Sequence, residues 1–512
     1  MVIKILFLVV FFAITLGVGI YCRKTATDVN GFVLGGRSVG PWLTAFAYGT
    51  SYFSAVIFIG YAGQFGWKYG LASTWIGIGN AILGSLLAWV VLGRRTRIMT
   101  QMLGSATMPQ FFEKRYDSKA LKVISSAITF IFLIPYTASL FNGLSRLFES
   151  AFGIDYAYCV IAMSVLTGIY VIAGGYMATA INDFIQGIIM LVGIVAVIGA
   201  VLGSHGGFIG SLNELAKVPV PETAGPITAS GSFASMFGPD PVNLLGVVIL
   251  TSLGTWGLPQ MVQKFYAIKS EKAISRGTLI STFFAVIVAG GCYFLGGFAR
   301  ISGVEAVNDV PVGGYDAVIP KMLEGLPTLL IAIVIVLVLS ASMSTLSSLV
   351  LTSSSTLTLD FIKGSFVKNM KEKKQLLIMR IFIVVFIVIS AMIAIYQVKS
   401  ESGAVAFIAQ LMGVSWGALA GAFLAPFLYG LYAKWASKAA TFACMIFGAG
   451  IMVANLLFRS SFPVILQSPI NCGAFAMFAS LVIFPIICLI SKKPSKETLE
   501  KSFTSIKERL ED

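Results

Sequence analysis

The stretch LVLSASMSTLSSLVLTSSSTLTLD, residues 337–360, places a series of Ser and Thr residues inside an apolar run long enough for a membrane helix. One face of such a helix carries positions i, i+3, i+4 and i+7, which here are Ala341, Ser344, Thr345 and Ser348. A stripe of hydroxyl oxygens suits a hard cation, because such ions take oxygen ligands. The same side chains also hydrogen-bond within their own helix or allow helices to pack closely. The stripe alone leaves a cation site and a packing surface both open.

The composition of the chain indicates a membrane protein. Of its 512 residues, 57% are hydrophobic and 11% are charged, which is outside the usual range of soluble domains. The net charge of +14 comes from short loops between apolar runs, so we expect it to set topology and not to bind nucleic acid. His205 is the single histidine and the six cysteines lack metal-ligand spacing. The sequence therefore predicts neither a metal cluster nor an enzyme.

Apolar runs of membrane-crossing length predict thirteen transmembrane helices. The first carries its positive charge after the apolar run, unlike a signal peptide, so we expect it to be retained. Most Lys and Arg residues, Lys264 among them, fall in alternate predicted loops. The positive-inside rule then places the N-terminus outside and the C-terminus in the cytoplasm of a multi-pass plasma-membrane protein. The spans are expected near 1–22, 41–66, 70–93, 121–148, 155–174, 177–203, 241–266, 275–302, 326–362, 376–397, 403–431, 439–458 and 470–491.

Two of these spans are interrupted. The second contains AYGTSYFS at 47–54, and the seventh contains GTWGLPQ at 254–260, where Pro259 removes a backbone donor. Broken backbone at membrane depth is tolerated where it is buried in protein or lines a cavity. The two breaks lie five spans apart, as expected for inverted five-helix repeats with broken first helices. Incidental kinks are the alternative, since Gly and Pro are frequent in transmembrane helices.

Asp183 is a carboxylate inside a predicted span. An ionisable group within the membrane is costly and marks a functional site by default. A helix N-terminal acid stabilised by the dipole is the alternative. Asp183 lies several residues past Gly174 and Gly175, where its helix is expected to begin, and this favours the functional interpretation.

Five stretches carry further patterns: GGRSVGP at 35–41, RLFESAFG at 146–153, GGY at 174–176, NDFIQG at 182–187 and MSTLS at 343–347. Together they resemble the sodium:solute symporter family, most closely its sodium/proline branch. The segment 256–259 and the context of Asp183 also resemble the sodium/pantothenate branch. The resemblance implies an all-α, leucine-transporter-type fold with a 5+5 inverted repeat. Its parts would be one extra N-terminal helix (1–22), the first repeat (41–203), the second repeat (241–431), two C-terminal helices (439–491) and a cytoplasmic tail (492–512).

The resemblance also implies a sodium site between the second and ninth spans, with sodium as the co-transported ion. Its ligands would be the backbone carbonyls of Thr50, Phe53 and Ala341 and the hydroxyls of Ser344 and Thr345. Some family members have a second sodium site, for which this chain offers Asp183, Ser344, Ser347 and Ser348. One or two ions per cycle both remain open.

The expected substrate chamber lies beside the breaks and includes Ser51, Tyr52, Tyr136, Thr255, Trp256 and Pro259. Tyr52 stands where the proline branch has an aspartate, so the solute stays open. The sequence predicts uptake of a small organic solute, an amino acid such as proline, driven by inward sodium movement through alternating access. Pantothenate, a monocarboxylate or a sugar are the alternative solutes.

Two other classes of function are a channel and a transport-like solute sensor. A channel is expected to repeat one pore loop, whereas this chain has two dissimilar breaks. The short C-terminal tail offers a sensor no signalling output. The expected partners are the solute and the lipid bilayer, with the chain working as a monomer and no protein partner evident.

Overall fold

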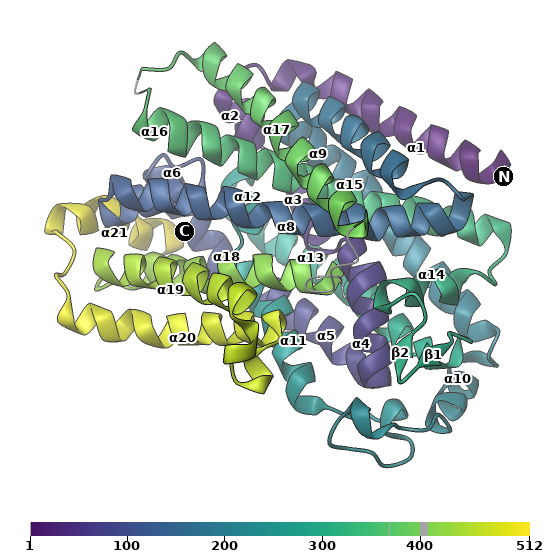
Figure 1. Cartoon of the computed structure of the whole chain (residues 1–512). Coiled ribbons are helices and arrows are strands. Elements are labelled where there is room, and N and C mark those ends of the chain that lie inside the picture. Colours follow the sequence, from purple (N-terminus) through teal and green to yellow (C-terminus); the bar gives the residue numbers. More distant parts are fainter. Residues whose placement is uncertain (1, 368, 400–407, 512) are drawn as a thin grey trace.

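The computed structural model describes residues 2–367, 369–399 and 408–511, and these form a bundle of long helices (Figure 1). Four π-helical segments, η3 (Val56–Tyr61), η5 (Asn80–Leu87), η6 (Trp89–Gly93) and η12 (Leu357–Ile362), continue neighbouring helices, and η9 (Gly254–Gly257) is a 3₁₀ turn. The α-helices are α1 (Val2–Tyr21), α2 (Val29–Leu34), α3 (Pro41–Tyr52), α4 (Ala62–Tyr69), α5 (Thr74–Gly79), α6 (Arg94–Met102), α7 (Met108–Tyr116), α8 (Lys119–Phe152), α9 (Tyr156–Gly203), α10 (Gly207–Ala216), α11 (Pro241–Leu253), α12 (Pro259–Ala267), α13 (Glu271–Gly296), α14 (Val318–Leu323), α15 (Thr328–Thr356), α16 (Lys363–Ser365), α17 (Glu372–Lys399), α18 (Ile408–Tyr432), α19 (Lys438–Leu457), α20 (Pro469–Ile490) and α21 (Lys496–Glu511).

Side-chain caps fix the beginnings of several long helices. The side chains of Asp155, Asp240, Ser270 and Ser437 accept hydrogen bonds from the first turns of α9, α11, α13 and α19. Each cap satisfies one of the backbone N–H groups that a helix start leaves without a partner. These polar residues thus mark where apolar helices begin.

Ten helices among the described residues are long and apolar enough to cross a membrane, or eleven with the bent pair 241–257 and 259–267. Two of them, 56–102 and 156–203, have 47 and 48 residues, about twice the ~20 residues that one crossing needs. Left-handed backbone interrupts the first at Gly70 (φ 58°, ψ −139°) and the second at Gly175 (φ 54°, ψ −146°). The count of thirteen spans stays a prediction. The predicted span 403–431 begins in residues outside the described part.

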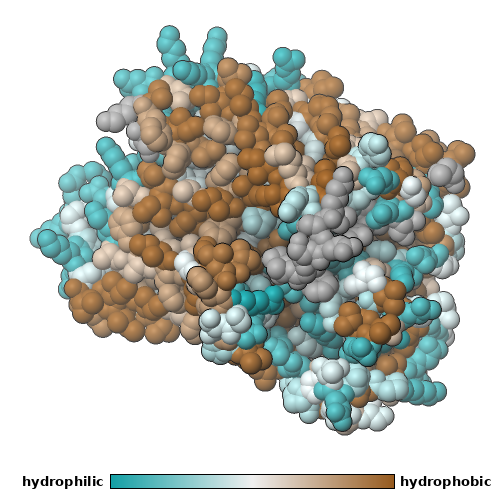
Figure 2. Space-filling view, in the orientation of Figure 1, coloured by the Kyte–Doolittle hydropathy of each residue, from teal (hydrophilic) through white to brown (hydrophobic). Residues whose placement is uncertain are grey.

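Apolar side chains cover much of the outside of the bundle. Figure 2 shows a broad brown region along the helices, with polar residues gathered at the ends. Leu279 on α13 is 75% exposed and Leu489 on α20 is 87% exposed. A water-exposed surface of this kind would be unfavourable, whereas lipid accommodates it, so the surface fits a multi-pass membrane protein.

The two predicted breaks are present. The last backbone hydrogen bond of α3 runs from the Phe53 N–H to the Gly49 carbonyl, and Phe53 is extended (φ −89°, ψ 111°). Leu258 is likewise extended (φ −85°, ψ 120°), and α11 and α12 meet there at a 47° bend. In both places an extended residue separates two helical halves.

The terminal helices flank the centre of the bundle. Helix α1 packs against α9 and α15, while α19 and α20 pack against α18 on the opposite side (Figure 1). Helix α15 contacts α3, α8, α9 and α17. Its residues from Val334 to Thr356 are all buried, so the hydroxyl stripe lies in the protein interior.

One detail departs from an all-helical chain. Strands β1 (Ala306–Val307) and β2 (Val310–Pro311) form an antiparallel hairpin with Ala306 opposite Pro311. It lies between the predicted spans 275–302 and 326–362. The sequence pattern missed it because each strand has only two residues, too few for a recognisable alternation.

Candidate functional site

The hydroxyl stripe of α15 meets the break at the end of α3. The hydroxyl oxygens of Ser344 and Thr345 each lie 3.2 Å from the carbonyl oxygen of Thr50. They also lie 3.2 and 3.1 Å, respectively, from the carbonyl oxygen of Ala341. All four residues are fully buried. Two carbonyl and two hydroxyl oxygens from helices far apart in sequence therefore converge on one place.

The break explains why these carbonyl oxygens are available. Helix α3 makes its last backbone bond to the carbonyl of Gly49, and the next backbone bonds go to the carbonyl of Ser54. The carbonyls in between lose the donors that a continuous helix would supply. The hydroxyl of Thr345 reaches two of them, Thr50 at 3.2 Å and Ser51 at 3.5 Å. Phe53, the remaining residue of the expected sodium site, lies at the break itself.

The residues expected at a second sodium site are arranged differently. Asp183 on α9 is fully buried, and its Oδ2 lies 4.0 Å from the ammonium of Lys264 on α12. Lys264 donates a hydrogen bond of 2.9 Å to the hydroxyl of Ser348, which lies 2.7 Å from the hydroxyl of Ser51. Ser347 instead donates to the carbonyl of Ser344 on its own helix. The structure brings Asp183 and Ser348 together around a lysine.

The position of Lys264 corrects the prediction that it belongs to a cytoplasmic loop. It lies within α12, where it is 2% exposed and all nine helix residues are buried. In the sequence, a lysine inside the end of an apolar span cannot be distinguished from a lysine in the loop that follows it. Pro259 is the first residue of α12, so the span continues past the break and takes Lys264 into the interior.

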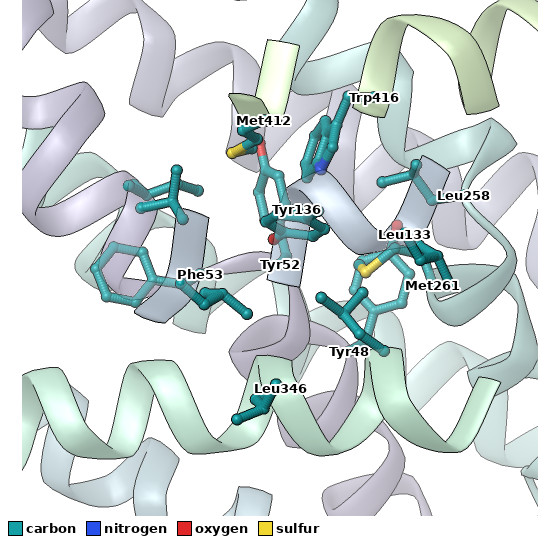
Figure 3. Close-up of a cluster of buried hydrophobic side chains, with 14 of the residues drawn as sticks. Tyr48, Tyr52, Phe53, Leu133, Tyr136, Leu258, Met261, Leu346, Met412 and Trp416 are labelled. Carbon is teal, nitrogen blue, oxygen red and sulfur yellow. The ribbon is translucent and has the colours of Figure 1, made fainter. Parts of the chain in front are cut away.

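An aromatic cluster lies beside the break in α3. Tyr52 stacks on Trp416 of α18 with ring centroids 5.9 Å apart, and Tyr136 of α8 meets the same indole edge-on at 5.9 Å. Figure 3 shows Tyr52, Tyr136 and Trp416 together with Met412. The sequence pointed to both tyrosines. It missed Trp416, because a tryptophan in a uniformly apolar span is also typical of the lipid interface.

Three buried polar groups in this region face one another. They are the hydroxyl of Tyr136 and, directed toward it, the hydroxyl of Ser54 and the indole N–H of Trp416. None of the three makes a hydrogen bond of regular geometry in the part of the chain that the structure describes. Buried polar groups are normally well hydrogen-bonded, and a polar ligand held among the aromatic rings would offer them better-aligned partners.

The other residues expected in the chamber hold neighbouring backbone or face elsewhere. Thr255 and Trp256 donate hydrogen bonds of 3.2 and 2.9 Å to the carbonyls of Gly84 and Leu83 in η5. These bonds fasten the second break to a neighbouring segment. Pro259 starts α12, and the hydroxyl of Ser51 faces the stripe of α15.

A polar cavity of about 580 Å³ opens at one end of the bundle. Its walls come from α4, the start of α11, the loop at the β-hairpin and the segment before α20. The charged and amide side chains around it include Lys68, Asp240, Asn243, Asp309 and Asn471. The cavity is large enough to admit a small hydrated solute.

Residues 32–448 match the sequence profile of the sodium:solute symporter family. The chain belongs to this family. Sodium/proline symporter 2 of Staphylococcus saprophyticus is 30% identical over 459 residues, which cover 87% of this chain and 84% of that protein. A sodium/proline symporter of Staphylococcus aureus is 30% identical over 456 residues, with the same shares covered.

Solved structures share the fold of this sodium:solute symporter. A Na⁺-coupled sialic acid symporter in a substrate-bound outward-open state gives a TM-score of 0.73 at 16% identity, covering 96% of this chain and 99% of that one. A nucleobase-cation-symport-1 family transporter in a closed conformation gives 0.52 at 14% identity, covering 92% and 97%. Both neighbours have the leucine-transporter fold.

Membership of the sodium:solute symporter family confirms the resemblance stated from the sequence motifs. The protein is a multi-pass membrane transporter that couples sodium to solute uptake, with sodium as the co-transported ion, and it is not an enzyme.

Proposed function

We propose that this symporter binds its sodium ion between α3 and α15 and imports a small amino acid such as proline. The sodium ligands would be the carbonyls of Thr50, Phe53 and Ala341 with the hydroxyls of Ser344 and Thr345. The convergence of the α15 hydroxyls on the carbonyl of Thr50, at 3.2 Å each, carries the proposal. Uncharged oxygens suit an ion that has to bind and then leave in every cycle.

Coupling follows from where these ligands lie. They come from two helices, so a bound ion would tie the break in α3 to α15. It would favour the conformation in which the ligands of both helices surround the ion. An ion shifts the conformational equilibrium only through its differential affinity for the two states. A membrane potential of 100 mV adds about 2.3 kcal/mol of driving force for each positive charge moved inward. Alternating access would then release ion and solute into the cytoplasm.

The solute would bind in the chamber next to the ion site. The rings of Tyr52, Tyr136 and Trp416 offer an apolar surface, and the polar groups of Ser54, Tyr136 and Trp416, which make no hydrogen bond of regular geometry among the described residues, offer polar contacts. This mixture suits a compact solute with an apolar ring and a polar end, which proline has. Sodium/proline symporters among the relatives support the same choice. Pantothenate, a monocarboxylate or a sugar are the alternatives.

We also propose a number of spans and a division of the chain into repeats. It comprises thirteen spans, with repeats at 41–203 and 241–431, flanking helices at 1–22 and 439–491, and a tail at 492–512. The start of α1 and the C-terminal helix α21 lie toward opposite ends of the bundle (Figure 1), which supports an odd number of spans. The polar cavity would open to the outside and admit the solute. The monomer would be the working unit.

Uptake by purified protein in proteoliposomes tests the proposal. An inward sodium gradient should drive accumulation of radiolabelled proline, and replacing external sodium with potassium should abolish it. A hundredfold excess of unlabelled pantothenate, lactate or glucose in parallel assays separates the alternative solutes. Accumulation that continues unchanged in potassium would reject sodium coupling of proline uptake. Sodium-driven accumulation of another solute in place of proline would change the proposed substrate and would not contradict the proposed ion site.

A further inference from the structure

A buried lysine lies where the sequence offers ligands for a second cation. The ammonium of Lys264 is 2.9 Å from the hydroxyl of Ser348 and 4.0 Å from Oδ2 of Asp183. Lys264 is 2% exposed, and Asp183 is fully buried. The group joins three helices, because Lys264 is on α12, Ser348 on α15 and Asp183 on α9.

The surroundings of this ammonium have the chemistry of a cation site. Asp183 supplies a negative charge, and neither of its oxygens has a hydrogen-bond partner among the described residues. The ring of Tyr176 lies 5.2 Å from the ammonium, within the range of a cation–π contact. A carboxylate away from water requires a positive partner, and Lys264 provides it.

The remaining oxygens expected at a second sodium site are occupied elsewhere. The hydroxyl of Ser344 faces the carbonyls of Thr50 and Ala341, and the hydroxyl of Ser347 donates to the carbonyl of Ser344. Asp183 and Ser348 are therefore the members of the set that surround the ammonium. Both face a cation that belongs to the chain.

We propose that the ammonium of Lys264 is a built-in cation that takes the place of a second sodium ion, so that the symporter carries one sodium ion per cycle. The inference rests on the proposed ion site between α3 and α15. A sodium ion added beside Asp183 would share one carboxylate with the ammonium. Two like charges in a buried site repel each other strongly, because the protein around them screens charge far less than bulk solvent does.

The built-in cation is also connected to the main site. Ser348, which accepts from Lys264, lies 2.7 Å from the hydroxyl of Ser51, and the carbonyl of Ser51 lies 3.5 Å from the hydroxyl of Thr345. The tethered ammonium cannot dissociate. It therefore keeps α12 against α15 whether the main site is filled or empty, whereas sodium comes and goes.

Equilibrium binding of radioactive sodium to the purified full chain tests this without knowledge of the solute. Wild type should saturate at one ion per chain. Lys264→Met, which keeps the length of the side chain and removes its charge, should saturate at two. Lys264→Met with Asp183→Asn should return to one, and Lys264→Arg should stay at one. Lys272→Met is the matched control, because Lys272 is an exposed lysine at the start of α13.

The outcomes separate this inference from the proposed ion site. Saturation of wild type at two ions overturns the built-in cation, and this measurement needs no variant to fold. A folded Lys264→Met protein, checked by its thermal melt, that still saturates at one ion also overturns it. Absence of sodium binding in wild type, or one ion that persists in Ser344→Ala/Thr345→Ala, rejects the main site between α3 and α15. In that case the built-in cation is rejected with it.

Discussion

At the scale of single residues, Ser344 and Thr345 are the side-chain ligands of the proposed sodium site. Their hydroxyls reach the carbonyl of Thr50 across the interface between α15 and α3. Replacing either with Ala removes one buried oxygen and should cost on the order of 1–2 kcal/mol. The sodium concentration for half-maximal uptake should rise roughly tenfold for each substitution.

A matched control for this prediction lies on the same helix. Ser355 is also buried, but among the described residues its hydroxyl donates within α15, to the carbonyl of Thr352. Ser355→Ala should leave the sodium requirement of uptake near that of wild type. An equal rise in Ser355→Ala would indicate a general effect of weakening α15 and not the loss of a ligand.

Tyr136 lies in the proposed solute chamber and is not one of the proposed ion ligands, so it can distinguish solute binding from ion binding. Its buried hydroxyl faces the side chains of Ser54 and Trp416 without a hydrogen bond of regular geometry among the described residues, and its ring contacts Trp416. Tyr136→Phe keeps the ring and removes a buried hydroxyl that is only weakly hydrogen-bonded, so the thermal melt without solute should change little. The KM for the solute should rise by about tenfold if the lost hydrogen bond contributes ~1.4 kcal/mol. Sodium binding without solute should not change, and a shift in it would place Tyr136 at the ion site instead.

At the scale of elements, the N-terminal side of α3 is fastened to the end of α12. Lys269 donates a backbone hydrogen bond of 2.9 Å to Val39, and Val39 donates one of 3.3 Å to Ala267. Arg37 reinforces this bridge by donating to the carbonyls of Ser105 and Tyr266 at 2.5 and 3.2 Å. Burial lowers the pKa of Arg37 to about 10, so its guanidinium stays charged at neutral pH. The contact joins the two broken helices at the end we assign to the cytoplasm.

Arg37→Ala should loosen this bridge. The guanidinium ties the N-terminal side of α3 to the carbonyl of Tyr266 in α12 and to that of Ser105 between α6 and α7, and its loss leaves the two backbone bonds alone to hold the ends of α3 and α12 together. Hydrogen exchange of the Val39 and Lys269 amides should speed up by at least about tenfold, since roughly 1.4 kcal/mol of local stability is removed. Arg23→Ala, at an exposed arginine in a neighbouring loop, is the control. Unchanged exchange at Val39 in Arg37→Ala would mean that the bridge holds without the arginine.

The two helix breaks could be predicted from the sequence, whereas their packing partners could not. Both breaks were found because Gly, Pro and hydroxyl residues interrupt apolar runs, and the extended backbone lies at Phe53 and Leu258. The neighbour of a break could not be found in this way. Trp416 stacks on Tyr52 at the first break, and Lys264 binds Ser348 of α15. Both contacts join helices that are distant in sequence, and no local pattern encodes them.

Asp360 is a buried carboxylate that the sequence pattern does not reveal. It is the last residue of the hydroxyl-rich stretch 337–360 and lies near the end of the predicted span 326–362, and it is fully buried. Its oxygens accept from Thr107 at 2.6 Å and from Gln110 at 2.8 Å. Both donors belong to the start of α7, far away in sequence. A carboxylate beside a lysine-rich loop looks solvated until its distant partners are known.

At the scale of the whole molecule, the proposed topology makes a direct prediction. An odd number of spans puts the two termini on opposite sides of the membrane, and the basic loops put the C-terminus in the cytoplasm. An epitope added at the N-terminus should be accessible to antibody on intact cells stripped of their wall. One added after residue 512 should require permeabilisation. A C-terminal epitope that reacts on intact cells would reverse the assignment of sides.

The hydroxyls of Ser344 and Thr345 have a consequence for the ion-free state. Without a cation each can donate its proton to the carbonyl of Thr50 or of Ala341. These internal hydrogen bonds satisfy the polar groups of the proposed site. A sodium ion bound there would have to displace them and turn both hydroxyl protons away. If the proposed site is correct, this competition weakens sodium binding and favours release of the ion in every cycle.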